Sequence, residues 1–351
     1  MRGIEIFEGG DPLLGIFLAA FSYVAALTGA GLASGQEVLA FFSAFSRYGV
    51  IGIAAASVLI GAFGGAVSEY ALHADIGYEE MTARLFSCRG KRLYSVLVFA
   101  FSVCTCAVMC ACFGSLFEMM GLSSAVGSGV LAAACAAVLI CGGGAAVRIN
   151  AALGAAIFIC AASVCLYLLG YREHQAFRGG AALASGVTYA GYNLISVGTV
   201  LASGRMFLKR KGDGFLVGFA SAVMVFVLLT LMWAILCIYE GKINLGELPI
   251  VTLALRESKA LAAGYSAVIA AAVFTTGISS GMCAAEHIAP YTGRRRAVML
   301  CMAAAFVISG AGFSALVNTV YRYCGMVGIF AACVVIYKVM RRIIAREERR
   351  F

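Results

Sequence analysis

The residues with the clearest chemical potential lie between Leu27 and Glu37, in the sequence LTGAGLASGQE. Three glycines fall within a short stretch, and an amide and a carboxylate, Gln36 and Glu37, follow directly. The surrounding apolar segment runs from Leu13 to Phe45 and is long enough to cross a bilayer. Each glycine weakens a helix by roughly 1 kcal/mol relative to alanine, so the pattern predicts an unwound turn at membrane depth. Backbone groups freed there need partners, and a broken membrane helix is a common way to build a solute site.

Glu37 is the most unusual of these residues, because a carboxylate within an apolar span is by default a functional candidate. It could bind a cationic group of a substrate, relay a proton, or cap the half-helix that begins near Gln36. The positive end of that half-helix would attract an anionic group such as a carboxylate. The candidate solute-binding residues of this break are Thr28, Gly29, Ala30, Gly31, Ser34, Gly35, Gln36 and Glu37.

A second interruption is predicted at YAGYN, residues 189–193, within the apolar run from Ala181 to Leu208. Tyr189, Tyr192 and Asn193 offer hydroxyls and an amide beside freed backbone. These groups could contact a solute, or they could form hydrogen bonds between helices.

The sequence TTGISS, residues 275–280, places hydroxyl pairs four positions apart on a third apolar run. Such pairs share one helix face. The hydroxyls could also bond back to carbonyls of their own helix.

The composition restricts the class of protein. The 351 residues are 62% hydrophobic and only 12% charged, which predicts a polytopic membrane protein without a separate soluble domain. The net charge of +9 comes from basic clusters between apolar runs and at the C-terminus, as the positive-inside rule produces, and not from a nucleic-acid-binding surface. The acidic N-terminus does not resemble a cleaved signal peptide. Most cysteines lie within apolar runs, where they serve as small hydrophobic residues; a soft-metal site around residues 104–112 is the alternative.

Ten membrane spans are predicted, with both termini in the cytoplasm of a cell, which for this fold class means the plasma or inner membrane. That orientation places most basic residues inside, including Lys209–Lys211 and Arg294–Arg296. Glu69, Glu118 and Glu286 then fall near span ends and are expected at the interface. The spans are residues 13–45, 50–72, 93–120, 126–147, 151–169, 181–208, 215–239, 262–285, 297–320 and 325–340.

These spans divide a single transmembrane domain, residues 1–351, into two halves of five. Residues 13–170 and 181–340 are nearly equal in length, and each half opens with a glycine-interrupted helix. Because five is odd, the second half starts from the opposite side of the membrane, which predicts an inverted repeat. Residues 341–351 form a basic cytoplasmic tail. Two short amphipathic helices are expected outside the spans, one at residues 79–86 and one opened by Pro249.

Several of these motifs resemble the YkvI family of bacterial membrane proteins, whose first helix carries a Gly-Ala-Gly-Phe-Ala-Ser-Gly-Gln-Glu signature. Leu32 stands where that family has phenylalanine, and Arg322 where it has proline. The resemblance covers nearly the whole chain. Its motifs are Gly29–Glu37, Phe41–Phe42, Tyr48–Gly49, Gly52–Ile53, Tyr192–Leu194, Gly312–Ser314, Tyr321 and Gly325.

The resemblance implies a fold and a function. The family is similar to the amino acid–polyamine–organocation superfamily, which has a LeuT-like five-plus-five inverted repeat with helices 1 and 6 broken. It implies a secondary transporter for an amino acid or related solute, coupled to sodium or to protons by alternating access. A sodium ion would be held by Gly29 in the first break and by Thr276, Ser279 and Ser280 of the eighth span. No other cofactor is expected.

Three other functions are alternatives to a transporter: a receptor, an enzyme and a channel. A nutrient-sensing receptor subunit, as in spore germination, would use the same fold without bulk flux. A membrane enzyme is disfavoured, because the sequence has no HExxH motif and no nucleophile elbow. Paired breaks favour a closed midplane site over a channel. The expected partners are a small solute and the lipid bilayer, and the sequence does not define the oligomeric state.

Overall fold

The computed structural model describes residues 12–141, 157, 159–168, 181–195, 197–239 and 244–348. Every regular element in these ranges is a helix, as predicted. Five helical stretches are long and apolar enough to cross a membrane. They are α4 (Gly49–Ala74), α6 (Cys88–Met119), α11 (Asp213–Tyr239), α13 (Lys259–Thr292) and the stretch Phe313–Ile344.

Shorter helices occupy the other predicted spans. The first span consists of α1 (Pro12–Leu27), α2 (Ala30–Ser34) and α3 (Gln36–Phe41), followed by a 3₁₀ turn, η1 (Ser43–Tyr48). The fourth, fifth, sixth and ninth spans contain α7 (Ser124–Cys141), the helix Ile159–Leu168, α9 (Ala182–Leu194) with α10 (Gly198–Ser203) and η2 (Gly204–Phe207), and α14 (Arg294–Ser309).

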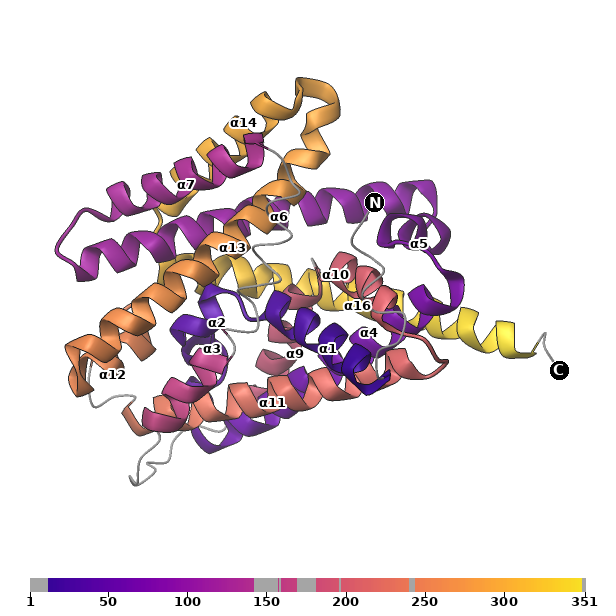
Figure 1. Ribbon diagram of the computed structural model, residues 1–351, viewed down its shortest axis with the longest axis horizontal. Helices are drawn as coiled ribbons and strands as arrows, with labels where there is room; N and C mark the ends of the chain where they lie inside the picture. Colours follow the sequence, from indigo (N-terminus) through magenta and orange to yellow (C-terminus); the bar gives the residue numbers. More distant parts are fainter. Residues whose placement is uncertain are drawn as a thin grey trace.

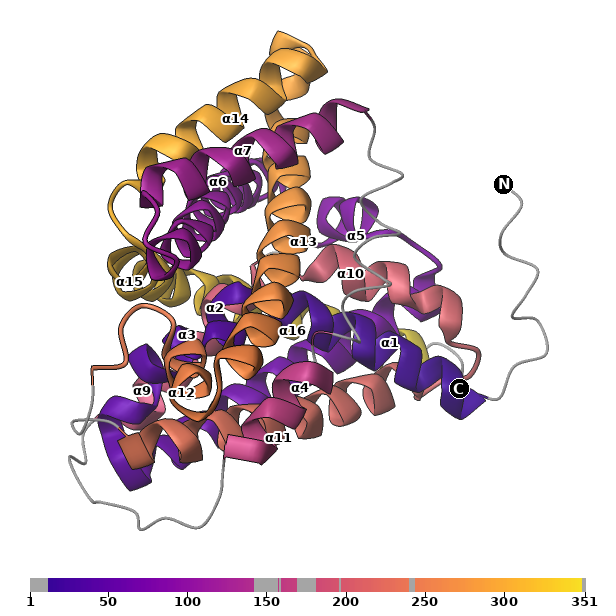
Figure 2. The ribbon, with the colours of Figure 1, turned by 60° about the vertical axis from the view of Figure 1, so that its left-hand side comes forward.

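The helices form two groups (Figure 1). In one group α6, α7, α13 and α14 all pack against one another. In the other, α4 packs along α11 and α9, while α1 lies on α11 and the last helix lies on α9. Figure 2 shows that α13, a member of the first group, extends from α7 and α14 down toward α2, α3 and α12.

Glycines allow the closest helix contacts in the second group. A Cβ at Gly218 of α11 would overlap the carbonyl oxygen of Gly61 in α4, and one at Gly186 of α9 would overlap that of Gly52. Small residues at such crossings let backbones approach, which is how membrane helices associate without a hydrophobic driving force.

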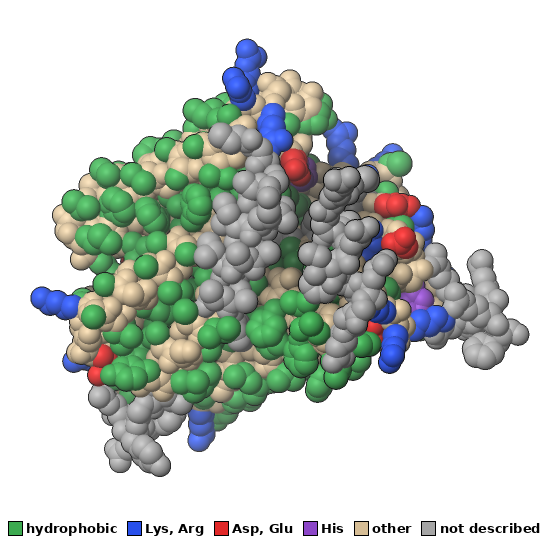
Figure 3. All heavy atoms as spheres, in the orientation of Figure 1, with side chains coloured by type: hydrophobic (Ala, Val, Ile, Leu, Met, Phe, Trp, Pro, Cys, Tyr) green, Lys and Arg blue, Asp and Glu red, His purple; other side chains and the backbone are tan. Residues whose placement is uncertain are grey.

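The outer surface fits a lipid environment. Exposed large apolar side chains lie along the long helices, among them Phe219 of α11, Val307 of α14 and Phe330 of the last helix. On the face in Figure 3, hydrophobic side chains cover much of the described surface, and Lys and Arg lie mostly toward its edges. The molecule is therefore a multi-pass membrane protein.

Both predicted amphipathic helices are present, as α5 (Tyr78–Leu85) and α12 (Pro249–Glu257). Pro249 stands at the first position of α12, where its missing amide hydrogen costs nothing. Ser258 then begins α13 by accepting hydrogen bonds from the amides of Ala260 and Leu261. These local signals fix the connection between α11 and α13.

The predicted boundary between the last two spans is wrong. The ninth span ends at Ser309, and the last helix begins at Phe313, through α15 (Phe313–Leu316), the π-helical η3 (Val317–Tyr321) and α16 (Arg322–Glu348). The turn is at Gly310–Gly312, where Gly312 takes φ +89°. Residues 321–324 contain no helix breaker, so the chain continues there as a helix, and α16 extends through most of the predicted tail.

Some predictions fall outside the described residues. These are the N-terminal segment before residue 12, the end of the fourth span and start of the fifth, the loop at 169–180, and residues 349–351.

Candidate functional site

The predicted break in the first span is present. Helix α1 ends at Leu27, and the Thr28 amide and hydroxyl both donate to the Val24 carbonyl, at 2.8 and 2.7 Å. Gly29 is extended, with ψ 178°, and its amide donates to the Leu27 carbonyl at 2.9 Å. The unwound region is shorter than predicted, because Ala30–Ser34 re-form a turn of helix as α2.

A second interruption follows at Gly35, which separates α2 from α3. Gly35 takes φ +85°, a left-handed conformation that side chains disfavour. Ile250 of α12 and Leu236 of α11 pack against its Cα. The Gln36 amide donates to the Ser34 hydroxyl at 3.3 Å. Ser34, and not Glu37, therefore accepts this hydrogen bond at the start of α3.

Glu37 lies against Gly31. A Cβ at Gly31 would collide with the Glu37 carboxylate, so glycine at this position makes room for the acidic group. Glu37 is only 3% exposed. Its Oε2 atom has no hydrogen-bond partner in the described part of the chain, and the nearby Tyr192 hydroxyl has none either. One oxygen of a buried carboxyl group is thus left without a hydrogen bond, which is rare in proteins.

Aromatic rings surround this carboxylate. Tyr189 and Tyr192 of α9 lie beside Glu37, and Tyr192 stacks on Tyr321 with ring centroids 4.4 Å apart and planes at 17°. The other rings of this aromatic cluster are Phe41 and Phe42 of α3 and Phe101 of α6, with centroid distances to these tyrosines of 5.0 to 6.3 Å.

Tyr321 and Phe101 were not among the predicted site residues. Tyr321 ends the π-helical turn η3, and such turns are frequent at functional sites. Tyr321 is one of the motifs of the YkvI resemblance, but its π geometry has no sequence signature that would place it beside Glu37. Phe101 is one of several apolar residues on α6 and could not be singled out from the sequence.

The second predicted interruption is displaced. Tyr189–Asn193 are all helical, and α9 ends at Leu194, so the chain leaves the helix between Leu194 and Gly198. Gly191 serves close packing rather than unwinding, since a Cβ there would overlap the Gly325 carbonyl of α16. Asn193 donates to the Tyr189 carbonyl of its own helix at 3.0 Å. The last two turns of α9 nonetheless bring Tyr189 and Tyr192 to Glu37.

The first break meets the eighth span at the predicted sodium position. The Cα of Gly29 faces the Thr276 side chain, whose Oγ1 is 3.8 Å from the point a Cβ would occupy. Thr275 and Ser279 bond back to their own helix, with Ser279 donating to the Thr275 carbonyl at 3.0 Å. Thr276 is therefore placed beside the break. Of Thr276, Ser279 and Ser280, Thr276 alone lies within 4 Å of the point that a Gly29 Cβ would occupy.

A polar network that the sequence did not reveal closes one end of this region. Gln36 Nε2 donates to Ser314 Oγ at 3.0 Å, and the Ser314 amide donates to Glu247 Oε1 at 3.3 Å. Ser115 of α6 donates to the other oxygen of Glu247. This chain of contacts joins the first span, the last helix, the α11–α12 connection and α6. Its members are far apart in sequence, so no local pattern indicates that they are in contact.

The other acidic residues were expected at the interface. Glu118 and Glu286 are exposed, in agreement. Glu69 is instead 1% exposed and accepts hydrogen bonds from the Gly212 and Gly214 amides at 2.8 and 3.0 Å. The turn before α11 folds over this carboxylate, which removes it from solvent.

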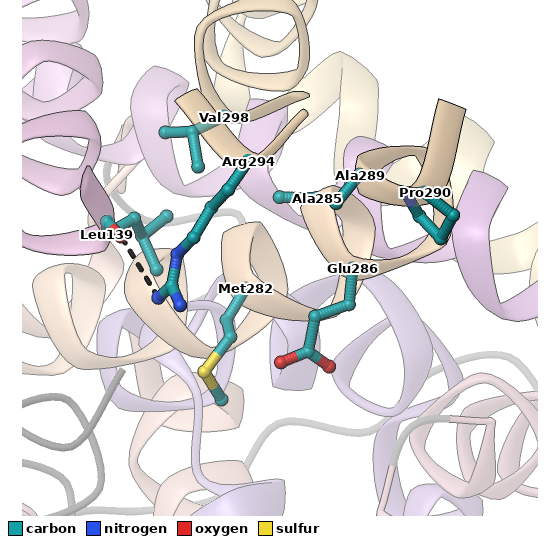
Figure 4. Close-up of a pocket in the computed structure, with 8 residues that line it drawn as sticks. All are labelled: Leu139, Met282, Ala285, Glu286, Ala289, Pro290, Arg294 and Val298. Carbon is teal, nitrogen blue, oxygen red and sulfur yellow. Dashed lines mark hydrogen bonds between the residues drawn. The ribbon is translucent and has the colours of Figure 1, made fainter. Parts of the chain in front are cut away.

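A separate pocket of about 230 Å³ lies between α7, α13 and α14 (Figure 4). It is mostly apolar, with Glu286 and Arg294 as its charged residues. Arg294 donates to the Leu139 carbonyl near the end of α7 at 3.2 Å. This pocket belongs to one helix group alone, so it is not where the two groups meet.

Comparison with known proteins agrees with this description. No family model matches the chain. A segment of 110 residues is 30% identical to the uncharacterized membrane protein YkvI of Bacillus subtilis strain 168, which confirms that resemblance locally. The match covers 31% of this chain and 32% of YkvI, so the chain spans about a third of the curated relative it matches.

The fold is that of a known transporter. A crystal structure of the Eremococcus coleocola manganese transporter, in complex with an aromatic bis-isothiourea compound, aligns with a TM-score of 0.59 over 96% of this chain and 80% of that chain, at 10% identity. Two mutants of that transporter align with TM-scores of 0.54, at 12% identity, over 97% of this chain and 74% of theirs.

Proposed function

We propose that this protein is a secondary active transporter of a small solute. The observation that carries the proposal is the position of Glu37: a buried, unpaired carboxylate on a broken helix, where the two helix groups meet. A broken helix at membrane depth is a common way to build a transporter site. The fold shared with a manganese transporter supports this class of function over an enzyme.

The contacts of α2 support alternating access. This short helix packs on α13 and on α6, both in the opposite group, and the Tyr265 hydroxyl of α13 donates to the Ala33 carbonyl at 2.6 Å. Because Gly29 and Gly35 flank α2, it can stay attached to one group while α1 and α3 move with the other. Rocking one group against the other would then expose Glu37 to each side in turn.

The helix pairings support the inverted five-plus-five repeat. Exchanging the two halves maps each span onto its counterpart five spans later. The contacts follow that exchange: α4 packs on α11, α6 on α13 and α7 on α14, while the α1–α11 contact has its counterpart in α9–α4. The proposed topology has ten spans, with both termini in the cytoplasm and the protein in the cell membrane.

The solute is proposed to be an amino acid or a related compound, and the coupling ion sodium or a proton. Thr28, Gly29 and the polar residues around Glu37 supply the solute site, and the Gly29–Thr276 contact supports the sodium site. The proposal needs no cofactor and assigns no catalytic residues.

Uptake by proteoliposomes tests the function. Purified protein is reconstituted, and labelled amino acids and amines are offered under a sodium gradient or a pH gradient. We expect uptake driven by one gradient and abolished by Glu37→Gln. Glu286→Gln is the matched control, because it removes an exposed carboxylate outside the site. A ligand that raises the melting temperature without any flux would instead support the nutrient-sensing receptor.

A further inference from the structure

The described side chains that act on the Glu37 carboxylate are tyrosines and a cysteine, and none of them is basic. The groups that act on its carboxylate are Tyr189 and Tyr192 of α9, Tyr321 of η3 and Cys112 of α6. Arg322 lies on Phe41, with its guanidinium 5.8 Å from the ring centroid, and donates to the Ala40 carbonyl. Across the described residues, no salt bridge to Glu37 is found.

An unpaired carboxylate is costly in this position. Moving a charge from water into an apolar environment without a partner costs several kcal/mol in real proteins. Two states remove the cost: the carboxyl group holds a proton, or a cation sits beside it. Both cannot hold at once on one carboxylate, so proton and cation compete.

An organic cation fits these surroundings better than a divalent metal ion. Among the described residues, no group of three or more His, Cys, Asp and Glu side chains is placed to hold a metal ion. The faces of tyrosine and phenylalanine rings attract ammonium groups, most strongly where water is excluded. Six such rings, with one carboxylate, are the recognition chemistry of an organic ammonium ion.

We infer that Glu37 and the aromatic cluster form a single site that binds either a proton or an organic ammonium ion, and never both. This inference rests on the proposed transport function and names its substrate class and its coupling. Binding breaks the O–H bond of the carboxylic acid, the proton passes to bulk water, and the carboxylate pairs with the ammonium group. Release of the cation returns the proton. A cycle through both sides of the membrane exchanges one cation for one proton.

Choline is the probe for binding, because its charge does not change with pH. Any pH dependence of its affinity therefore reports on the protein. The neutral analogue 3,3-dimethylbutanol has nearly the same shape and is the matched ligand control. Ethylammonium is the second probe, in case a quaternary group is too large for the site.

Titration calorimetry in two buffers of different ionisation enthalpy measures the protons released on binding. We expect one proton per cation, and an apparent affinity that rises about tenfold per pH unit while the empty site is protonated. The neutral analogue should release none. Glu37→Gln should lose both binding and release, and Glu286→Gln should keep both. No proton release with either cation, or release that persists in Glu37→Gln, would overturn the inference.

Substitution of Tyr321 separates the ring from the hydroxyl. Tyr321→Phe keeps the stacked face, so affinity for choline should change less than about threefold, whereas Tyr321→Leu should lower it at least tenfold. Equal losses in both variants would contradict a role for the ring.

Flux distinguishes failure of the inference from failure of the proposed function. Uptake of leucine without proton release by any cation would keep the transporter and overturn the shared site. Proton-coupled choline binding without flux of any solute would keep the shared site and overturn the transporter.

Discussion

Among the described residues, two glutamates lie almost fully buried, and their surroundings differ sharply. Glu69 in α4 accepts two backbone hydrogen bonds from the turn before α11, and His73 Nδ1 lies 3.1 Å from its Oε1 atom. Glu37 in α3 leaves its Oε2 atom without a hydrogen bond from any described residue. Their exposed fractions are nearly the same, at 1% and 3%.

The difference separates a structural carboxylate from a functional one. Glu69 accepts hydrogen bonds from the backbone of the same protein and fixes α11 to α4. Glu37 is given space by Gly31 and a ring of aromatic side chains, yet its Oε2 atom has no hydrogen bond from a described residue. Burial alone therefore does not identify a functional acid in a membrane protein, whereas burial without partners does.

Replacing Glu69 should have the largest effect on stability. Glu69→Ala leaves the Gly212 and Gly214 amides without their acceptor, and each unsatisfied buried group costs about 1–3 kcal/mol. We expect a marked fall in melting temperature in detergent, measured by fluorescence-detected size exclusion. Glu69→Gln, which keeps one acceptor, should lose less. An unchanged melting temperature in Glu69→Ala would mean that Glu69 has no structural role.

Replacing Glu37 should give the opposite pattern. Glu37→Gln keeps the side-chain volume and removes a charge that the protein does not pair, so the melting temperature should hold or rise. Solute uptake and proton release should nevertheless be abolished, as flux and calorimetry would show. If Glu37→Gln destabilised the protein as much as Glu69→Ala, the two carboxylates would share a structural role.

Gly31 tests whether the backbone contact positions the Glu37 carboxylate. The added methyl group of Gly31→Ala collides with the Glu37 carboxylate and should weaken cation binding about tenfold, or roughly 1.4 kcal/mol. Gly264→Ala, at a site on α13 with open space around the new methyl group, is the control. Calorimetry with choline compares the two. Equal affinities would mean that the Gly31 contact does not position the carboxylate.

The smallest expected effect is at the polar network beyond Gln36. Ser314→Ala removes the acceptor of the 3.0 Å hydrogen bond from Gln36, which should cost about 0.5–1.5 kcal/mol of stability. Thermal unfolding of Ser314→Ala measures it, with Ser163→Ala, at an exposed position within a helix, as the control. A loss as large as that from Glu69→Ala would show that this network contributes as much to stability as the Glu69 contact between α4 and α11.

The sequence was most informative where one short segment determines the structure. The glycines at 29 and 35 interrupt the first span as predicted, and Pro249 and Ser258 begin α12 and α13 through local chemistry. The glycine pattern was misleading in α9, because Gly191 is required for contact with α16 and not for a turn. Local propensity cannot tell these two uses of glycine apart.

Long-range geometry accounts for the remaining differences. Glu69 is expected at the interface from its place near the end of a span, but the turn before α11 covers it. The π-helical turn that carries Tyr321 to Tyr192 depends on how the last helix packs. The Gln36–Ser314 and Ser314–Glu247 contacts join residues 278 and 67 positions apart. None of these could follow from one segment read alone.

The role of Glu37 in moving the solute is tested by uptake into proteoliposomes. These contain wild-type, Glu37→Gln or Glu286→Gln protein. The vesicles have an acidic interior, and labelled choline is offered outside. The account predicts uptake that collapses when the pH gradient is dissipated, is absent in Glu37→Gln and is unchanged in Glu286→Gln. Uptake by Glu37→Gln at the wild-type rate would contradict it, because the unpaired carboxylate would then have no part in moving the solute.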